Sequence, residues 1–187
     1  RPRKEVEALM GLFLSYLKRE AKKLKAEGVR LRVVGNRSRF SERMQRSIVE
    51  AEALACEGDT TLVIAADYGG RWDITEAAKQ LAADVVAGSL SLDQIDEEAL
   101  HGHMALADLP APDLLIRTGG DQRISNFLLW QSAYTELYFC KQYWPDFDGA
   151  ALDEAVQEFN SRQRRYGLSG DQVAPLQIDK QEGLNGA

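Results

Sequence analysis

The feature that most constrains the fold of this chain is a continuous apolar segment, TTLVIAADY, which lies between Gly58 and Gly69. A strand that is apolar on both faces is typical of a parallel sheet covered by helices, because a strand with one wet face alternates between polar and apolar residues. A second β-branched segment, residues 29–34, follows Gly28, and helical patterns separate the two segments. The sequence therefore predicts an α/β fold with a mostly parallel central sheet flanked by helices.

Length, charge and cysteine content narrow the class of protein. With 187 residues, the chain is long enough for one domain whose core needs no disulfides, and its net charge of −6 argues against a nucleic-acid partner. Cys56 and Cys140 are far apart and lack metal-ligand spacing, so buried free thiols are favoured over a disulfide. No segment approaches the roughly 18 to 20 apolar residues of a membrane span, and no signal-peptide pattern opens the chain. We therefore expect a cytoplasmic protein.

Apolar residues at three- and four-residue spacings predict helices around the two strand segments. The first helix opens the chain and ends at Gly28, and the second is capped by Ser38 or Ser41 and runs to about Ala55. The inner face of the second helix is predicted to carry Met44, Ile48, Ala51 and Leu54.

Three further helices are predicted downstream. One begins at Asp73 or Thr75 after the Gly-rich turn and ends near residue 86, and residues 91–101 indicate a short acidic helix. The last runs from about Asp148 to residue 166, with three apolar residues facing inward: Leu152, Val156 and Phe159. Arginines near its end suit the helix dipole.

The stretch with the most distinctive chemistry runs from residue 113 to 136, DLLIRTGGDQRISNFLLWQSAYTE. An apolar strand leads into a Gly-Gly turn, and Arg117 before the turn and Arg123 after it place two guanidinium groups close in sequence, with Ser125 nearby. Arginine offers planar, bidentate donors that match phosphate oxygens, and glycines let backbone N–H groups approach an anion. A carboxylate repels an anion, so Glu136 is better suited to a hard cation such as Mg²⁺ that shares phosphate oxygens. The pattern suggests a site for a diphosphate and a metal.

Other interpretations stand beside this one. Arginines near a Gly-Gly turn are often solvated or paired with a carboxylate such as Asp121, and residue types alone leave both possibilities open. His101 and His103 lie two residues apart, which does not place them on one helical face, so we expect no metal site there. The segment GGRWDI resembles a phosphate cradle at a helix N-terminus, but it lacks a dinucleotide-binding or P-loop motif.

The segment DLLIRTGGDQRISNFLLWQSAYTELYF, together with AADYGGRWDI and WPDF, resembles the cis-prenyltransferase family. The similarity extends over residues 1–167, which we expect to form the catalytic domain, whereas residues 168–187 are expected to form a flexible tail. The resemblance also implies an apolar tunnel between the sheet and the helices. The family's catalytic aspartate lies on a phosphate loop that would precede Arg1, so the resemblance names no catalytic residue within this chain.

The resemblance assigns roles to particular residues. Those that match the family's substrate-diphosphate positions are Arg1, Arg117, Arg123, Ile124 and Ser125. Glu136 matches the carboxylate associated with Mg²⁺. The residues expected to line the product tunnel are Leu9, Leu12, Phe13, Thr60 and Leu62.

The activity implied by the resemblance is cis-prenyl chain elongation. Isopentenyl diphosphate would condense with an allylic diphosphate, such as farnesyl diphosphate, to give a long polyprenyl diphosphate for cell-wall lipid carrier synthesis. The resemblance further implies a homodimer that contacts a membrane peripherally when product leaves. Two alternatives remain: a noncatalytic partner subunit of a two-chain prenyltransferase, and a generic diphosphate-binding domain.

Overall fold

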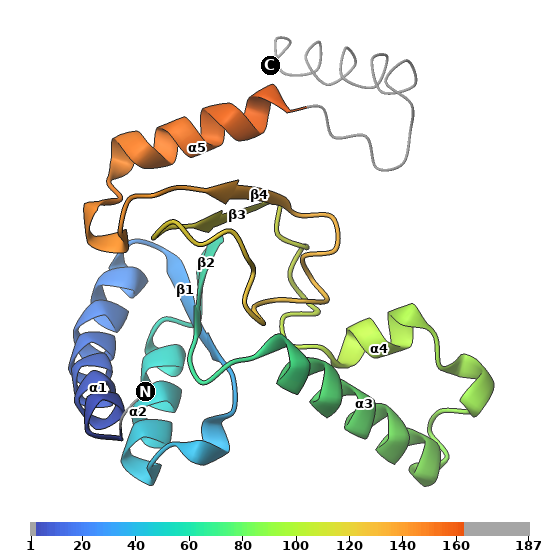
Figure 1. The fold of residues 1–187 in the computed structure, drawn as a ribbon. Helices are drawn as coiled ribbons and strands as arrows, with labels where there is room; N and C mark the ends of the chain where they lie inside the picture. Colours follow the sequence, from blue (N-terminus) through green and yellow to red (C-terminus); the bar gives the residue numbers. More distant parts are fainter. Residues whose placement is uncertain (1–2, 163–187) are drawn as a thin grey trace, which may run out of the picture. The chain divides into compact units, whose positions relative to one another are not determined.

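The computed structural model describes residues 3–162, without the side chains of residues 3–11, 14, 15 and 18. The chain divides into two compact units, Arg1–Asp108 and Leu109–Ala187, and each is described by itself (Figure 1). Arg1 and the expected tail at 168–187 lie outside the described residues.

The first unit is built on two parallel strands. Its elements are α1 (Arg3–Ala26), β1 (Val29–Val34), η1 (Arg37–Arg39), α2 (Glu42–Leu54), β2 (Thr60–Ala65), α3 (Gly70–Ala87), η2 (Leu92–Gln94) and α4 (Glu97–His103). β1 and β2 pair in parallel along their whole length, from Val29 opposite Thr60 to Val34 opposite Ala65. The predicted parallel pairing of strands separated by a helix is confirmed, because α2 connects the two strands.

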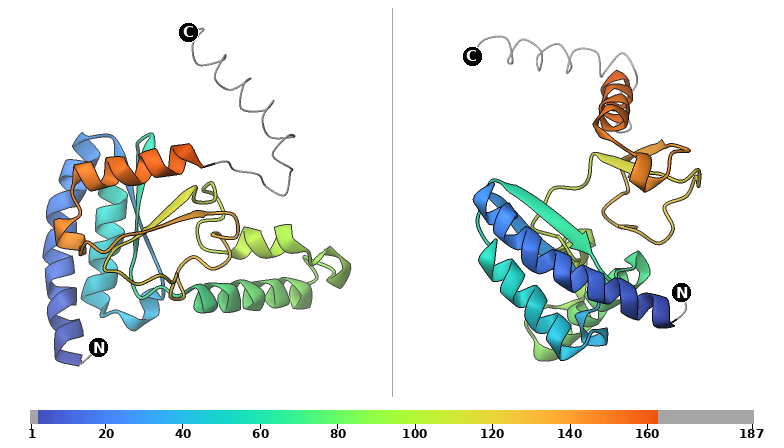
Figure 2. Two further views of the ribbon diagram at one scale, coloured as in Figure 1. Left: turned by 45° about the horizontal axis from the view of Figure 1, so that its top comes forward. Right: turned by 90° about the vertical axis from the view of Figure 1, so that its left-hand side faces the viewer.

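The core of the first unit lies between α1, α2 and β1, and α1 and α2 run side by side against the strands (Figures 1 and 2). Its buried residues are Leu17, Ala21, Leu31, Val33, Met44, Ile48, Ala51 and Ala55. The predicted inner face of the second helix is confirmed, with Leu54 partly buried against the same cluster. Ser41 caps this helix, because its side chain accepts a hydrogen bond from the backbone N–H of Met44.

β2 is more exposed than its composition predicts. Thr60, Leu62 and Ala65 are exposed, with Leu62 at 43%, so the expectation of a strand covered on both faces is wrong for the described residues. The reason is that β2 pairs only with β1 in a two-stranded sheet, and the core cluster draws its buried strand residues from β1. Apolar composition alone does not reveal which of two strands packs against the helices.

Two of the predicted helix boundaries are wrong. α3 begins at Gly70, with Gly69 as its N-cap, whereas Asp73 lies buried in the first turn. The Asp73 carboxylate accepts hydrogen bonds from the Tyr68 hydroxyl at 2.7 Å and from the Ala105 backbone N–H at 2.8 Å, so it serves tertiary contacts instead of capping. The expected acidic helix is two elements, η2 and α4, because the Asp96 side chain caps a new helix start.

The second unit contains another parallel strand pair. Its elements are β3 (Leu114–Arg117), β4 (Glu136–Phe139), η3 (Trp144–Asp146) and α5 (Gly149–Ser161). Leu114 lies opposite Glu136, and Arg117 lies opposite Phe139. The described residues thus hold two two-stranded parallel sheets, one in each unit.

The buried face of α5 differs from the predicted one. Ala151 and Ala155 are buried, whereas Leu152 and Val156 are 45% and 40% exposed. The helix runs beside β4, and small residues four positions apart face inward (Figure 1). Leu152 and Val156 each lie one position later and therefore point about 100° away from that face. Of the three predicted inward residues, Phe159 alone is half-buried.

Both cysteines are free, as predicted, but the expected burial is wrong for Cys56, which is exposed, while Cys140 is half-buried. Within residues 3–162, none of the helices combines the length and the hydropathy needed to span a membrane.

Candidate anion-binding site

The candidate site is a loop that begins where β3 ends, at Arg117. Gly119 and Gly120 follow with φ values of 86° and 81°, a left-handed conformation that glycine adopts without steric cost. Their backbone N–H groups donate to the carbonyl oxygens of Gln142 at 2.7 Å and Cys140 at 2.9 Å, in the segment after β4. The predicted role of these glycines as open anion donors is therefore wrong, because their amides already secure the turn.

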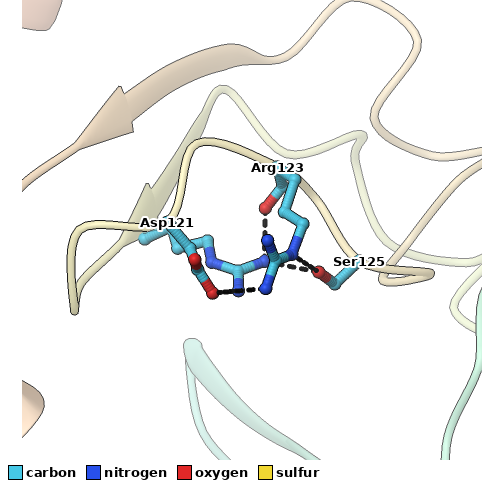
Figure 3. Close-up of polar contacts among 4 residues, drawn as sticks. Asp121, Arg123 and Ser125 are labelled. Carbon is cyan, nitrogen blue, oxygen red and sulfur yellow. Dashed lines mark hydrogen bonds and ion pairs between the residues drawn. The ribbon is translucent and has the colours of Figure 1, made fainter.

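The structure brings Arg117, Arg123 and Ser125 into one cluster (Figure 3). Nη1 of Arg117 donates to the Ser125 hydroxyl at 2.7 Å and to the backbone carbonyl of Arg123. Nε of Arg123 lies 3.2 Å from the same hydroxyl. Two guanidinium groups from arginines six residues apart are thus held around one serine, as the diphosphate interpretation requires.

Asp121 completes the cluster. Its Oδ2 atom accepts from Nη2 of Arg117 and from Nη2 of Arg123, each at 2.7 Å. Sequence reasoning considered this aspartate only as a competing partner for the arginines. In the structure the two arginines lie close together and both also pair with the Asp121 carboxylate, which lies between them (Figure 3).

The loop after Arg123 has an unusual backbone. Ser125, Asn126 and Leu128 have φ values of 46°, 64° and 43°, in the left-handed region that non-glycine residues rarely adopt. The turn is closed by a hydrogen bond from the Phe127 N–H to the Ile124 carbonyl at 3.2 Å. Conformations of this kind persist where surrounding contacts hold them and often mark binding sites. No pattern in the sequence indicated these angles.

Glu136 lies away from the arginine cluster along the strands. It is paired with Leu114, three residues before Arg117, which corresponds to about 10 Å along a strand. Nη1 of Arg162 donates to Glu136 Oε2 and to the Leu137 carbonyl, both at 2.9 Å, and its Nη2 donates to Glu158. The hydrogen bond to Glu158, which has the larger effect, and the hydrogen bond to Glu136 raise the pKa of the Arg162 guanidinium above its ordinary value.

Arg162 therefore has a specific structural role. The helix-dipole explanation offered for the arginines at this helix end is incomplete, because Arg162 is the C-cap residue of α5 and ties that helix to β4. The other two arginines, at positions 164 and 165, lie outside the described residues.

The replacement Arg162→Ala should destabilise the chain by about 2 kcal/mol, because two carboxylates and a strand carbonyl lose a charged donor. For a chain of this size, the melting temperature should fall by about 4–8 °C. Thermal unfolding followed by circular dichroism checks this. Lys79→Ala, which breaks an exposed ion pair with Glu76, is the control and should shift the midpoint by less than about 2 °C. If the two variants unfold at the same midpoint temperature, Arg162 does not have the structural role proposed for it.

The expected tunnel residues lie in the first unit. Phe13 packs against the core, whereas Leu12 is 68% exposed, and the side chain of Leu9 lies outside the described residues. Thr60 and Leu62 are exposed on β2. Their role as tunnel walls stays a prediction.

The described residues contain no group of three or more His, Cys, Asp or Glu side chains able to hold a metal. His103 uses Nε2 for Asp84 at 3.0 Å and Nδ1 for Gln80 at 3.2 Å, so protein contacts account for this histidine. A metal bound by this chain would have to take further ligands from substrate, water or residues outside the described part.

Two parallel α/β units, with an arginine loop at the end of a strand, define an α/β protein with a candidate anion-binding loop. Comparison with known proteins identifies its family. Residues 1–167 match the family model described as "Putative undecaprenyl diphosphate synthase". The chain belongs to this prenyltransferase family.

Curated relatives extend the match. The chain is 50% identical over 184 residues to a ditrans,polycis-undecaprenyl-diphosphate synthase, specific for (2E,6E)-farnesyl diphosphate, from Aliivibrio fischeri, covering 97% of this chain and 71% of the relative. It is 53% identical over 175 residues to the Pseudomonas aeruginosa protein of the same name, covering 92% and 69%. The chain thus spans about 70% of the length of these relatives.

Solved structures give the same result. A lavandulyl diphosphate synthase from Lavandula x intermedia, in complex with dimethylallyl diphosphate, is similar with a TM-score of 0.86 and 38% identity, covering 89% of this chain and 73% of that one. A "probable undecaprenyl diphosphate synthase" from Campylobacter jejuni has a TM-score of 0.77 and 32% identity, with coverage of 89% and 76%. The α/β fold expected from the resemblance is confirmed.

Proposed function

We propose that this chain carries out cis-prenyl chain elongation, condensing isopentenyl diphosphate with farnesyl diphosphate to build undecaprenyl diphosphate. The observation that carries the proposal is the convergence of Arg117, Arg123 and Ser125 in a chain of this family. The names of its curated relatives support the choice of substrate and product.

The arginine cluster suits the binding of isopentenyl diphosphate. Arg117 is 24% exposed and is fixed by the Ser125 hydroxyl and the Arg123 carbonyl, whereas Arg123 is 66% exposed and can approach a ligand from solvent. Two fixed positive charges would hold the diphosphate and so orient the alkene for reaction, which converts a bimolecular step into a positioned one.

The reaction itself balances without an added oxidant or reductant. The terminal alkene carbon of isopentenyl diphosphate forms a bond to the allylic carbon, and the bond from that carbon to the diphosphate oxygen breaks, with its electron pair leaving on diphosphate. A proton is then lost from the adduct to form the new cis double bond. The diphosphate of isopentenyl diphosphate stays on the arginine cluster during each condensation. It is then the allylic diphosphate of the lengthened chain and must leave the cluster before the next isopentenyl diphosphate binds.

We also propose Mg²⁺ as the metal, with Glu136 as its protein ligand in this chain. A partly buried carboxylate has the hard oxygen donors that Mg²⁺ prefers, and Mg²⁺ commonly binds through one or two carboxylates plus substrate phosphates. When bound, the ion would neutralise charge on the departing diphosphate. Glu136 would then serve both the ion and its hydrogen bond with Arg162.

The product tail needs an apolar surface. Leu12 and Leu62 expose apolar side chains, which supports their proposed role with Leu9, Phe13 and Thr60 as tunnel walls. Burial of the tail should contribute about 0.8 kcal/mol for each methylene removed from water. A homodimer, cytoplasmic location and peripheral membrane contact are further parts of the proposal and rest on the family resemblance; light scattering of the purified protein tests the dimer.

Incorporation of radiolabelled isopentenyl diphosphate into extractable lipid tests the proposed function. The protein should incorporate label only when farnesyl diphosphate and Mg²⁺ are both present, and EDTA should abolish incorporation. A noncatalytic partner subunit would incorporate label only after addition of a second protein. A generic diphosphate-binding domain would bind the labelled substrate and form no lipid under any of these conditions.

A further inference from the structure

The Asp121 carboxylate occupies the position between the two arginines where a substrate oxygen would bind. One atom, Oδ2, lies 2.7 Å from Nη2 of Arg117 and 2.7 Å from Nη2 of Arg123 (Figure 3). A single anionic oxygen held by two guanidinium groups is also the arrangement that a phosphate oxygen adopts among arginines. Asp121 thus imitates part of a ligand within the chain itself.

Both Nη groups of Arg117 already donate hydrogen bonds within the loop. Its Nη1 group is already directed at the Ser125 hydroxyl and the Arg123 carbonyl, and its Nη2 group is directed at Asp121. Arg123 is divided in the same way, with Nε toward Ser125 and Nη2 toward Asp121. An incoming oxygen that accepts the same two Nη2 hydrogen bonds must therefore take the place of Asp121 Oδ2.

We propose that Asp121 is a positioning residue that holds the two guanidinium groups together in the empty site and is displaced by the diphosphate of the substrate. The proposal rests on the proposed function to the extent that this loop is the diphosphate site. Two like-charged oxygens cannot share the position between the arginines, because their repulsion is strong at short distance.

The surroundings of Asp121 allow this exchange. Its side chain is 44% exposed, so the released carboxylate can be hydrated without burying a charge. Exposed ion pairs contribute little net free energy, so a doubly charged ligand can outcompete them. In the empty site, the same contacts keep Arg117 and Arg123 close together despite their mutual repulsion, which reduces the reorganisation needed when substrate arrives.

The variant Asp121→Asn tests the displacement, with inorganic diphosphate as the probe and isothermal titration calorimetry as the measurement. The amide keeps the shape of the side chain but removes the charge that competes with the ligand. We expect diphosphate to bind about three- to tenfold more tightly than to the wild type. Asp153→Asn removes one charge from an exposed position on α5 and serves as the matched control, with affinity unchanged.

A kinetic measurement separates displacement from a purely structural role. For Asp121→Asn, KM for isopentenyl diphosphate should fall by the same factor, since the substitution removes a charge that competes with the substrate for the two arginines. Unchanged or weaker diphosphate binding by Asp121→Asn, in protein with a wild-type circular dichroism spectrum, would overturn the proposal.

The variant Arg123→Ala distinguishes this outcome from failure of the proposed function. If Arg123→Ala loses diphosphate binding while Asp121→Asn shows no gain, the loop is the diphosphate site and only the displacement by substrate is wrong. If both variants bind diphosphate like the wild type, the loop is not the site, and the proposed function loses its supporting observation as well.

Discussion

Replacing Arg117 with alanine is expected to weaken the binding of isopentenyl diphosphate by about 100-fold, corresponding to about 2.7 kcal/mol for a lost charged donor pair. Arg117 is less exposed than Arg123 and contacts three other groups in the loop: Ser125, Asp121 and the Arg123 carbonyl. Its loss removes one positive charge and also leaves Asp121 with a single arginine partner, so the remaining site repels the ligand more strongly.

Calorimetry with isopentenyl diphosphate measures this effect, and KM in the elongation assay should rise by a similar factor. Arg46→Ala is the matched control, because it removes an exposed arginine of α2 that pairs with Glu42 and lies in the other unit. Its affinity and KM should equal those of the wild type. Wild-type kinetics in both Arg117→Ala and Arg123→Ala would exclude the loop as the substrate site.

Replacing Gly35 with alanine is expected to cause a large loss of stability. Gly35 follows β1 with φ at 127°, and a Cβ atom there would lie 2.0 Å from the carbonyl oxygen of Ala66, which follows β2. The backbone of one segment must move, although the Ala66 N–H donates to the Val34 carbonyl at 2.9 Å directly beside the collision. We expect a cost of about 3 kcal/mol and a melting temperature lower by about 6–12 °C.

Gly102→Ala gives a sharp comparison for this variant. Gly102 lies in α4 with open space around its missing side chain, and its backbone is not in the left-handed region. Alanine is a better helix former than glycine, so stability should rise by about 0.5–1 kcal/mol. Thermal unfolding should therefore move in opposite directions for the two variants. A Gly35→Ala protein as stable as the wild type would show that this close approach is not a constraint.

Local features of the fold could be predicted from the sequence because they depend on short-range physics. The strand at residues 29–34 is bounded by a helix-ending glycine and has β-branched residues, and the structure places β1 at Val29–Val34. Ser38 or Ser41 was predicted to cap the second helix, and the structure uses Ser41, with α2 beginning at Glu42. These signals operate within one or two helical turns and do not require knowledge of neighbouring elements.

Features that depend on tertiary partners could not be predicted. The inward face of α5 depends on its packing against β4, which buries Ala151 and Ala155 and leaves the larger Leu152 and Val156 exposed. Asp73 was a predicted start of α3, but its carboxylate accepts a hydrogen bond from the backbone N–H of Ala105, 32 positions away, and does not cap the helix. Periodicity identifies an apolar stripe, but the partner decides which edge of the stripe is buried.

The candidate site shows the same division. Residue types and the family resemblance identified Arg117, Arg123 and Ser125, and the structure brings them together. The bridging position of Asp121 and the engagement of Glu136 by Arg162 are matters of side-chain geometry, so no sequence pattern could distinguish them from ordinary surface ion pairs.

Mass spectrometry of the lipid that the protein forms from farnesyl diphosphate and isopentenyl diphosphate is the decisive measurement of its activity. We expect undecaprenyl diphosphate as the main product, with new double bonds in the cis configuration. The proposed activity would be contradicted by a product formed from dimethylallyl diphosphate alone. It would also be contradicted if correctly folded protein with Mg²⁺ present left both substrates unreacted.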